Sequence, residues 1–535
     1  YPPLEPENAP RGEIGIPRVL NMYENYPFWA TFFRDLGFRV ILSPFSTHAI
    51  YELGMESIPS ESECYPAKLA HGHAQWLIDH GVKTIFHPCV FYEHQEVPGA
   101  QNHYNCPIVV SYPENIKNNV EGVTDGSVRY LRPFLAFTSE KIAADRLAQF
   151  CREVWDIPEK ETRRAAHLAW EEQQRAKADV RAAGAKALAE MEKSGGSGIV
   201  LAGRPYHVDP EINHGIPELI AAYGLTVLTE DCLPIDFVPK RPVRVNDQWV
   251  YHSRLYTAAE FVCGRDDLEL IQLNSFGCGL DAVTTDEVCE LLEQGGKLYT
   301  CLKIDEVNNL GAVRIRIRSL LAAVAMRRER GIHSTAQVKP FERVHYTKEM
   351  QRERYTILAP QMSPIHFDLL EPIFRHYGYN FEVLKNDDRN AIDVGHKYVN
   401  NDACFPSITA VGQLMEAVTS GRYDTDHLAL IMSQTGGCCR ASNYIAFIRR
   451  ALKKAGLEHI PVISLNANGM ETNEGFRISP SLLLDAAHGI VLGDLLMRCL
   501  YRVRPYELEK GSANALHRKW RDICIDSLTS EHPKD

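Results

Sequence analysis

Residues 33–42 read Phe33-Arg-Asp-Leu-Gly37-Phe-Arg-Val-Ile-Leu42, and the matching stretch Phe374-Arg-His-Tyr-Gly378-Tyr-Asn-Phe-Glu-Val-Leu384 lies far along the 535-residue chain. In each stretch a phenylalanine stands four residues before a glycine, and an apolar run follows that glycine. A glycine in this position is typical of a helix C-terminus, where the chain turns into the next element. The two stretches therefore predict the same helix–turn–strand unit twice.

The repeat continues beyond these strands. Cys64-Tyr-Pro and Cys404-Phe-Pro both begin the pattern Cys-[Tyr/Phe]-Pro-x5-Gly, which ends at Gly72 and Gly412. A helix is expected to start at each, because proline is favoured in a first turn. Apolar strands are expected at 82–86 and 428–432, and each runs into a loop that carries cysteine, at Cys89 and Cys439.

A weaker third copy lies between the other two. Strands are expected at 198–202, 225–228 and 268–273, with a short helix at 215–224, and the last strand runs into Asn274-Ser-Phe-Gly-Cys278-Gly. Cys89, Cys278 and Cys439 then occupy equivalent places, just beyond a strand. Alternating strands and helices with short loops predict an α/β fold with three doubly wound, Rossmann-like parallel-sheet units.

The expected domain organisation follows from the repeat. Residues 12–137 form a first α/β cluster-binding unit, 138–195 a helical connector, 196–340 a second α/β unit, 341–504 a third α/β cluster-binding unit, and 505–535 a peripheral tail. The connector is rich in Ala, Glu, Lys and Arg and ends in Ser-Gly-Gly-Ser-Gly. The chain opens at Tyr1 in a proline-rich run typical of a linker, so we expect a module of a longer protein.

Composition narrows the class of protein. The formal net charge is −11 with no long basic run, which argues against nucleic acid or an anionic membrane as the main partner. No apolar stretch is long enough to predict a transmembrane helix. The 14 cysteines are too sparse for a disulfide scaffold, so a reducing, cytoplasmic setting with metal-binding or catalytic thiols is expected.

Six cysteines lie where ligands bind parallel sheets, beyond the carboxyl ends of strands or in adjoining loops. They are Cys64, Cys89, Cys106, Cys278, Cys404 and Cys439. Cys106 is expected in a loop that enters a strand at 108–111. Thiolates suit iron–sulfur clusters, whereas the Cys-x2–4-Cys pattern of zinc sites is absent from the sequence. Zinc stays the rival metal because several histidines lie near the first three cysteines.

Other polar residues are weaker candidates. His71, His207 and Glu306 are possible catalytic residues, since the last two lie in polar runs that directly follow strands. Each can equally be a capping group or a hydrogen-bond donor behind the site. No Gly-x4-Gly-Lys-[Ser/Thr] loop is present in the sequence, so no P-loop nucleotide site is indicated.

The motifs together resemble one family. They are Ser62-Glu-Cys64-Tyr-Pro-Ala-Lys, Asn105-Cys-Pro, Asn274-Ser-Phe-Gly-Cys278-Gly, Asn401-Asp-Ala-Cys404-Phe-Pro and Gln434-Thr-Gly-Gly-Cys-Cys439-Arg. The chain is similar to the double-cubane cluster proteins, related to 2-hydroxyacyl-CoA dehydratases, and in particular to the region fused behind the acyl-CoA dehydratase activase in long proteins of anaerobes.

The resemblance implies two [4Fe–4S] cubanes joined through a sulfide, an [8Fe–9S] cluster. One ligand set would be Cys64, Cys89 and Cys106, and the other Cys278, Cys404 and Cys439. An ATP-hydrolysing activase, fused or in complex, would deliver low-potential electrons, and the chain would be an iron–sulfur oxidoreductase that reduces a small molecule. Cys438 replaces a glycine expected before the last ligand, and we expect Cys439 to be that ligand because a helix follows it.

Two other functions stay open. The chain could be a dehydratase-like subunit that uses one [4Fe–4S] cluster on a 2-hydroxyacyl-CoA, or a non-catalytic zinc-bound or regulatory scaffold for the activase. Six ligand candidates favour the double cubane, since one cubane with an open iron needs three. The sequence leaves open the substrate, the redox potential, and whether the protein is a monomer or a homodimer.

Overall fold

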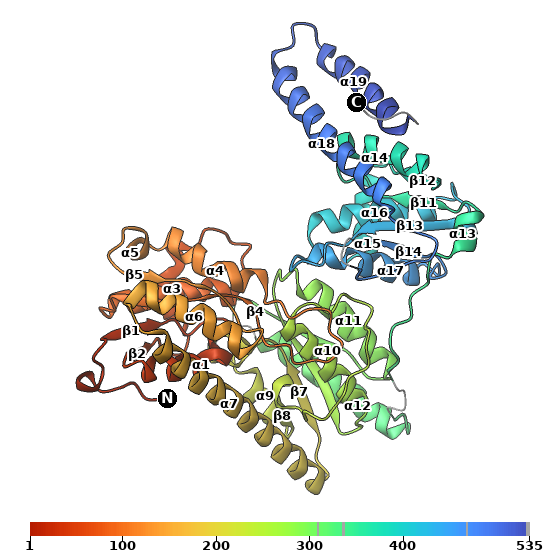
Figure 1. Ribbon diagram of the computed structural model, residues 1–535. Coiled ribbons are helices and arrows are strands. Elements are labelled where there is room, and N and C mark those ends of the chain that lie inside the picture. The colour runs from red at the N-terminus through yellow and green to blue at the C-terminus, as the bar shows by residue number, and fades with distance from the viewer. Residues whose placement is uncertain (308–309, 334–337, 467–468, 531–535) are drawn as a thin grey trace. The chain divides into compact units, whose positions relative to one another are not determined.

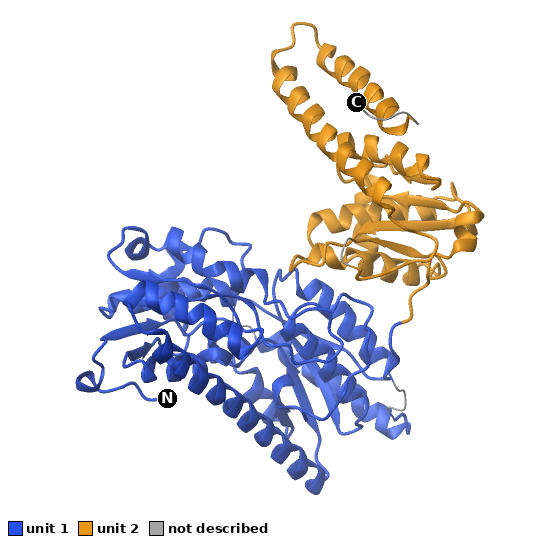
Figure 2. Ribbon diagram, viewed as in Figure 1, with its two compact units in different colours: residues 1–341 blue, residues 342–535 orange. Residues whose placement is uncertain are grey.

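The computed structural model describes residues 1–307, 310–333, 338–466 and 469–530. The chain divides into two compact units, residues 1–341 and 342–535 (Figure 2). The first unit holds two four-stranded parallel sheets and a small two-stranded one, and the second unit holds one four-stranded parallel sheet (Figure 1). The predicted α/β class with Rossmann-like parallel sheets is confirmed.

All three four-stranded sheets share one topology. Numbered along the chain within each sheet, the strands lie in the order second, first, third, fourth. The first sheet contains β1 (Glu13–Ile16), β2 (Arg39–Leu42), β3 (Thr84–Phe86) and β5 (Arg129–Leu131). The second contains β7 (Gly198–Ala202), β8 (Thr226–Leu228), β9 (Leu268–Ser275) and β10 (Thr300–Ile304). The third contains β11 (Thr356–Ala359), β12 (Phe381–Val383), β13 (Leu428–Ser433) and β14 (Val462–Leu465). The repeat seen in the sequence is therefore a repeat of topology.

Helices flank these sheets (Figure 1). In the first unit these helices include α2 (His48–Gly54), α3 (Tyr65–Asp79), α5 (Glu121–Thr124), α8 (Pro210–Asn213), α9 (Ile216–Ala221), α10 (Val250–Cys263), α11 (Asp281–Gln294) and α12 (Leu310–Glu329). In the second unit they include α13 (Lys348–Arg352), α15 (Arg389–Tyr398), α16 (Phe405–Thr419), α17 (Tyr444–Lys454), α18 (Pro480–Val503) and α19 (Ser512–Thr529).

The glycines that mark the repeat end helices as expected. Gly37 follows α1 (Met22–Asp35) with φ +79°, and Gly378 follows α14 (Pro364–His376) with φ +87°. Only glycine adopts this left-handed conformation without strain, which explains its presence at both turns. The phenylalanines four residues earlier, Phe33 and Phe374, are buried in the cores of their sheets.

Residues 140–194 form two helices. α6 (Glu140–Trp155) carries a serine cap, since the Ser139 hydroxyl accepts from the Ile142 amide. α7 (Glu159–Ser194) is the longest helix that the structure describes, packs along α1, and ends at Gly195 with φ +65° (Figure 1).

The strand expected at 108–111 is wrong. Residues Pro107–Asn119 form a helix, α4, that begins directly after Cys106. The β-branched run favoured a strand, but Pro107 fixes a helical φ at the first position, where no amide donor is needed. A short strand, β4 (Cys89–Tyr92), instead pairs with β6 (Phe134–Ala136).

The glycine that closes the Cys-[Tyr/Phe]-Pro-x5-Gly pattern has a packing role. A Cβ at Gly72 in α3 would lie 1.8 Å from the Ile50 carbonyl oxygen of α2, and a Cβ at Gly412 in α16 would lie 1.9 Å from the Ala391 carbonyl oxygen of α15. Each cysteine-capped helix therefore packs backbone to backbone against the helix before it. This contact sets where the cysteine at its N-terminus lies.

Candidate metal centre

Four of the six candidate cysteines lie at helix N-termini. Cys64, Cys106 and Cys404 are the N-cap residues of α3, α4 and α16, and Cys439 caps a 3-10 turn, Arg440–Asn443, that leads into α17. At this position the backbone amides of the first turn and the helix dipole stabilise a thiolate. Four separate thiols therefore share one backbone setting.

The common topology also shows which cysteines are equivalent. Cys64 and Cys404 begin the helix that leads into the third strand of their sheets, and Cys106, Cys278 and Cys439 lie between the third strand and the next long helix. Cys106 therefore has repeat counterparts, which the sequence pattern alone did not reveal. The signal was the proline directly after it, which marks a helix start as in Cys64-Tyr-Pro.

Three of these thiols influence one another in the first unit. Burial, and then the charge of Cys106, raises the pKa of the Cys64 thiol to about 12. Burial, Asp281 and Cys106 raise the pKa of Cys278 well above its usual value. The structure thus brings together cysteines from both sheets of the unit, although Cys278 lies more than 170 residues from Cys106 in the sequence.

A buried ion pair lies beside these thiols. The Arg204 guanidinium donates to the Asp281 carboxylate and, at 2.8 Å, to His252 Nε2, and all three side chains are buried. The positive charge of Arg204 lowers the pKa of Cys106 and Cys278 against the larger effect of burial. Arg204 therefore supplies the cation that buried thiolates need.

Two buried histidines next to Arg204 each keep one nitrogen without a partner. The Arg204 amide donates to His207 Nδ1 at 2.8 Å, and its side chain donates to His252 Nε2. Each ring therefore carries its proton on the other nitrogen, and neither His207 Nε2 nor His252 Nδ1 has a hydrogen-bond partner among the described residues. Buried donors left in this way are rare in folded proteins and indicate an acceptor group that completes the site.

These features fit an iron–sulfur cluster. Thiols supply its ligands, and the orphan N–H donors match the acceptor sulfides around such a cluster. Within the described ranges, no three His, Cys, Asp or Glu side chains are arranged to hold a single metal ion.

Cys89 has different surroundings. It is the first residue of β4, and its amide donates to the Pro133 carbonyl at 2.9 Å. Burial raises the pKa of its thiol to about 11, and its electrostatic neighbours are Glu114 and Arg132 rather than another cysteine. The pairing of Cys89 with Cys64 and Cys106 stays a prediction.

In the second unit, Tyr444 lies beside two candidate ligands. The Cys404 sulfur is 2.8 Å from the Tyr444 hydroxyl, and the charges of Cys404 and Cys439 both raise the pKa of Tyr444 after burial. Burial of Cys404 is outweighed by hydrogen bonds from Tyr444 and Ser407, so the pKa of its thiol is lowered. Cys439 is exposed, whereas Cys438 is half-buried. The choice of Cys439 over Cys438 stays a prediction.

The three weaker candidates are dispersed. His71 is buried and bonded through both ring nitrogens, to the Ser57 hydroxyl at 2.7 Å and the Tyr112 hydroxyl at 3.1 Å. Burial lowers its pKa to about 4, so it is a neutral residue that ties α3 to α4. Glu306 lies 3.5 Å from the buried ammonium of Lys68. Of the three, only His207 lies beside Arg204. His252, which the sequence did not single out, lies there as well.

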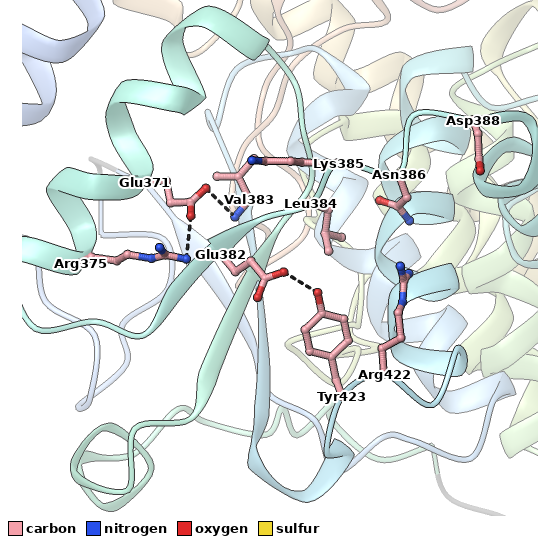
Figure 3. Close-up of a pocket in the computed structure, with 10 residues that line it drawn as sticks. All are labelled: Glu371, Arg375, Glu382, Val383, Leu384, Lys385, Asn386, Asp388, Arg422 and Tyr423. Atoms are coloured by element: carbon pink, nitrogen blue, oxygen red, sulfur yellow. Dashed lines mark hydrogen bonds and ion pairs between the residues drawn. The ribbon is translucent and has the colours of Figure 1, made fainter. Parts of the chain in front are cut away.

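A separate hollow of about 530 Å³ flanks the edge strand β12 in the second unit (Figure 3). Glu371 and Arg375 of α14 satisfy the outward backbone of this strand, since Arg375 donates to the Phe381 carbonyl and Glu371 accepts from the Val383 amide. Tyr423 likewise donates to Glu382 at 2.6 Å. These polar groups are bonded to one another or to the backbone of β12, which identifies a protected sheet edge rather than a reactive site.

Comparison with known proteins bears on the first unit. Residues 13–233 match the family described as CoA enzyme activase uncharacterised domain (DUF2229). The match covers the first sheet, α6, α7 and the first two strands of the second sheet. It relates this part of the chain to CoA enzyme activases. Among curated proteins no relative matches the chain. In the described part of the chain, no helix has the length and apolar character needed to cross a membrane.

Proposed function

We propose that this chain is an iron–sulfur reductase that carries a double-cubane [8Fe–9S] cluster and receives low-potential electrons from an ATP-dependent activase. The observation that carries the proposal is the mutual proximity of Cys64, Cys106 and Cys278 in the first unit, with Arg204 beside the last two. The activase-related match over residues 13–233 supports the partner. The motif resemblance supports the type of cluster.

The roles of the residues follow from their positions. Cys64 and Cys106 would hold cluster iron from two helix N-termini, with Cys278 favoured as third ligand by its electrostatic neighbours and Cys89 by the resemblance. Cys404 and Cys439 would be ligands in the second unit. His207 and His252 would donate hydrogen bonds to the bound group. When bound, the cluster supplies electrons at low potential for the reduction of a small molecule.

Arg204 and Asp281 would set the local electrostatics. The guanidinium lies near the thiolates, where it offsets the negative charge that ligation and reduction concentrate in a buried site. Asp281 holds that guanidinium in place and in turn needs its charge. Burial around the site excludes water, which strengthens each of these interactions.

The test is anaerobic reconstitution with iron and sulfide, followed by metal analysis and electron paramagnetic resonance of the reduced protein. About eight irons per chain support the double cubane. About four irons support the dehydratase-like alternative, which is favoured by one specific observation: the first unit alone gathers three thiols, enough for one cubane with an open iron. Bound zinc, or no bound metal, would instead support the non-catalytic scaffold function.

Single serine variants assign the ligands. Cys64→Ser, Cys106→Ser and Cys278→Ser should each lower the iron content by about half. Cys289→Ser is the matched control, because this half-buried thiol donates to Glu293 within its own helix. Iron loss in both Cys89→Ser and Cys278→Ser would support the six-ligand grouping that the resemblance implies, whereas full iron in Cys89→Ser would remove Cys89 from it.

A further inference from the structure

Three glutamates share two cations beside helices α1, α7 and α10. The Arg254 guanidinium donates to Glu24 at 2.7 Å and to Glu96 at 2.6 Å, and the Lys177 ammonium lies 2.9 Å and 2.7 Å from the same two carboxylates. Glu93 is 6% exposed and forms no ion pair with any residue that the structure describes. Two cations balance two carboxylates, so the group is neutral only when Glu93 carries a proton.

The charges of the two paired glutamates are fixed. Burial raises the pKa of Glu24 and of Glu96, but the charges of Arg254 and Lys177 outweigh it, so both pKa values are lowered. The carboxylates in turn outweigh the effect of burial on the two cations and raise the pKa of each. Glu93 is therefore the member of this group whose charge can change near neutral pH.

The hydrogen bonds of Glu93 accommodate both of its forms. The side-chain amides of Asn21, Asn25 and Asn105 all donate to one oxygen, Oε1, at 3.1, 3.0 and 3.1 Å. No described donor binds the other oxygen, which is free to carry a proton. Burial, and then the charge of Glu24, raises the pKa of Glu93 to about 7, and the amides of Asn25 and Asn21 act in the opposite direction.

Asn105 connects this carboxyl to a candidate ligand. Its side-chain nitrogen donates to Glu93, and its side-chain oxygen accepts from the backbone amide of Cys106 at 3.0 Å. The backbone amide of Glu93 donates to the His103 carbonyl at 3.1 Å, so the segment that follows Cys89 pairs with the segment that precedes Cys106. Glu93 is thereby fixed between two segments that each carry a candidate ligand.

A buried hydroxyl beside the three glutamates lacks a partner. The Tyr251 hydroxyl has no hydrogen-bond partner in the described part of the chain, and burial followed by the charges of all three glutamates raises its pKa well above the usual value. The next residue of α10, His252, bonds to Arg204 at the candidate metal centre. A buried hydroxyl in this state indicates a missing hydrogen-bonding group such as a water molecule, which could bring a proton to this place.

We propose that Glu93 takes up a proton when the neighbouring metal centre is reduced and releases it when the electron leaves. This inference rests on the iron–sulfur reductase function proposed above. One electron from the activase enters the centre, and one proton from water converts the Glu93 carboxylate to the carboxylic acid, so the net charge of the buried region does not change. The added electron repels the carboxylate, which favours its protonated form. When the electron passes to the substrate, the proton returns to water.

Infrared spectroscopy of the metal-free chain measures the proton on Glu93 directly. The carbonyl stretching band of a buried carboxylic acid should be present well below pH 7 and disappear as pH rises through about 7. Glu230 is the matched control, because burial and the charge of Asp231 raise its pKa to about 7 as well. The band of Glu93 is the part of the spectrum that Glu93→Gln loses and Glu230→Gln keeps.

Potentiometric titration of the reconstituted protein measures the coupling. As pH rises above about 7, the midpoint potential of the wild type should fall by up to about 59 mV for each tenfold decrease in proton concentration. In Glu93→Gln the potential should not depend on pH, with unchanged iron content. Asn25→Ala removes a donor that favours the anion, so the fall should begin at higher pH. Glu269→Gln, a buried carboxyl at the start of β9 that pairs with Lys297, should keep the wild-type pH dependence.

The outcomes separate this coupling from the reductase function. Equal pH dependence of the potential in the wild type and Glu93→Gln would overturn the coupling, and so would an infrared spectrum in which Glu93→Gln loses no band. Loss of iron in Glu93→Gln would assign this residue a structural role instead. A chain that binds no iron would refute the reductase function and the coupling with it, whereas bound iron with a pH-independent potential would refute the coupling alone.

Discussion

Replacing Gly412 by alanine tests the packing that positions Cys404. The added Cβ would lie 1.9 Å from the Ala391 carbonyl oxygen and 2.9 Å from the Gly395 amide nitrogen. Both are backbone atoms of α15 and cannot rotate away. The two helices must therefore move apart by about 1 Å or more before the methyl group fits.

The magnitude combines two opposing effects. Overpacking against backbone should cost about 3 kcal/mol, at the upper end of the usual range because the neighbour is rigid. Alanine is the better helix former by about 1 kcal/mol, which offsets part of that cost. We therefore expect Gly412→Ala to destabilise the second unit by about 2 kcal/mol.

Hydrogen exchange resolves this effect by segment. Peptides that cover α15 and α16 should exchange about 30-fold faster in Gly412→Ala, as about 2 kcal/mol requires. Gly437→Ala is the control, because nothing lies within 4 Å of its added Cβ. Equal exchange in the two variants would refute the close-packing explanation of the repeated glycine. In reconstituted protein, Gly412→Ala should also lose iron more readily, since α16 carries Cys404.

Three further outcomes are expected. Arg204→Met should destabilise the first unit by about 3–5 kcal/mol in urea unfolding, because it leaves the buried Asp281 carboxylate without its cation. Arg163→Met, which removes an exposed ion pair, should leave the unfolding midpoint nearly unchanged. Burial, and then the charge of Glu24, raises the pKa of Glu93 to about 7. The contribution of the protonated Glu93 to stability is therefore complete below its unfolded pKa near 4.5 and is lost as pH rises through 7. The free energy of unfolding of Glu93→Gln, relative to that of the wild type, should increase by about 3 kcal/mol between pH 4.5 and 8. Cys438→Gly should keep its full iron content while Cys439→Ser loses iron, and the opposite result would reverse the assignment of the ligand.

Most of the strands and helices could be predicted from the sequence. The apolar strands and the capping glycines Gly37 and Gly378 could be predicted from short stretches of sequence. Each depends on the local backbone conformation, which restricts the residue types at those positions. The same holds for the helix starts at Cys64 and Cys404. The helix after Cys106 was missed because its β-branched residues outweighed one proline, although the proline decided the backbone.

The site was less accessible to sequence reasoning. Nothing in the spacing of Cys278 places it near Cys64, because that proximity depends on how two sheets pack together. His252 carried no signal, since a lone histidine at a helix start is common and only its contact with Arg204 gives it a role.

The packing between the two sheets of the first unit explains how residues so far apart in sequence can share one site. One apolar cluster contains residues of α3 and α4, which belong with the first sheet, and of strands β7, β9 and β10 of the second sheet, and Cys64 and Cys106 pack against it. A polar network joins the same two parts: Arg254 of α10 donates to Glu24 at 2.7 Å and to Glu96 at 2.6 Å, and both carboxylates also bind Lys177. Two such different contacts leave the sheets little freedom to slide, so the spacing of the thiols is set before any metal arrives. A cluster bound there adds its ligation energy to a joint that already exists. Its loss should therefore loosen the joint between the sheets without unfolding either sheet.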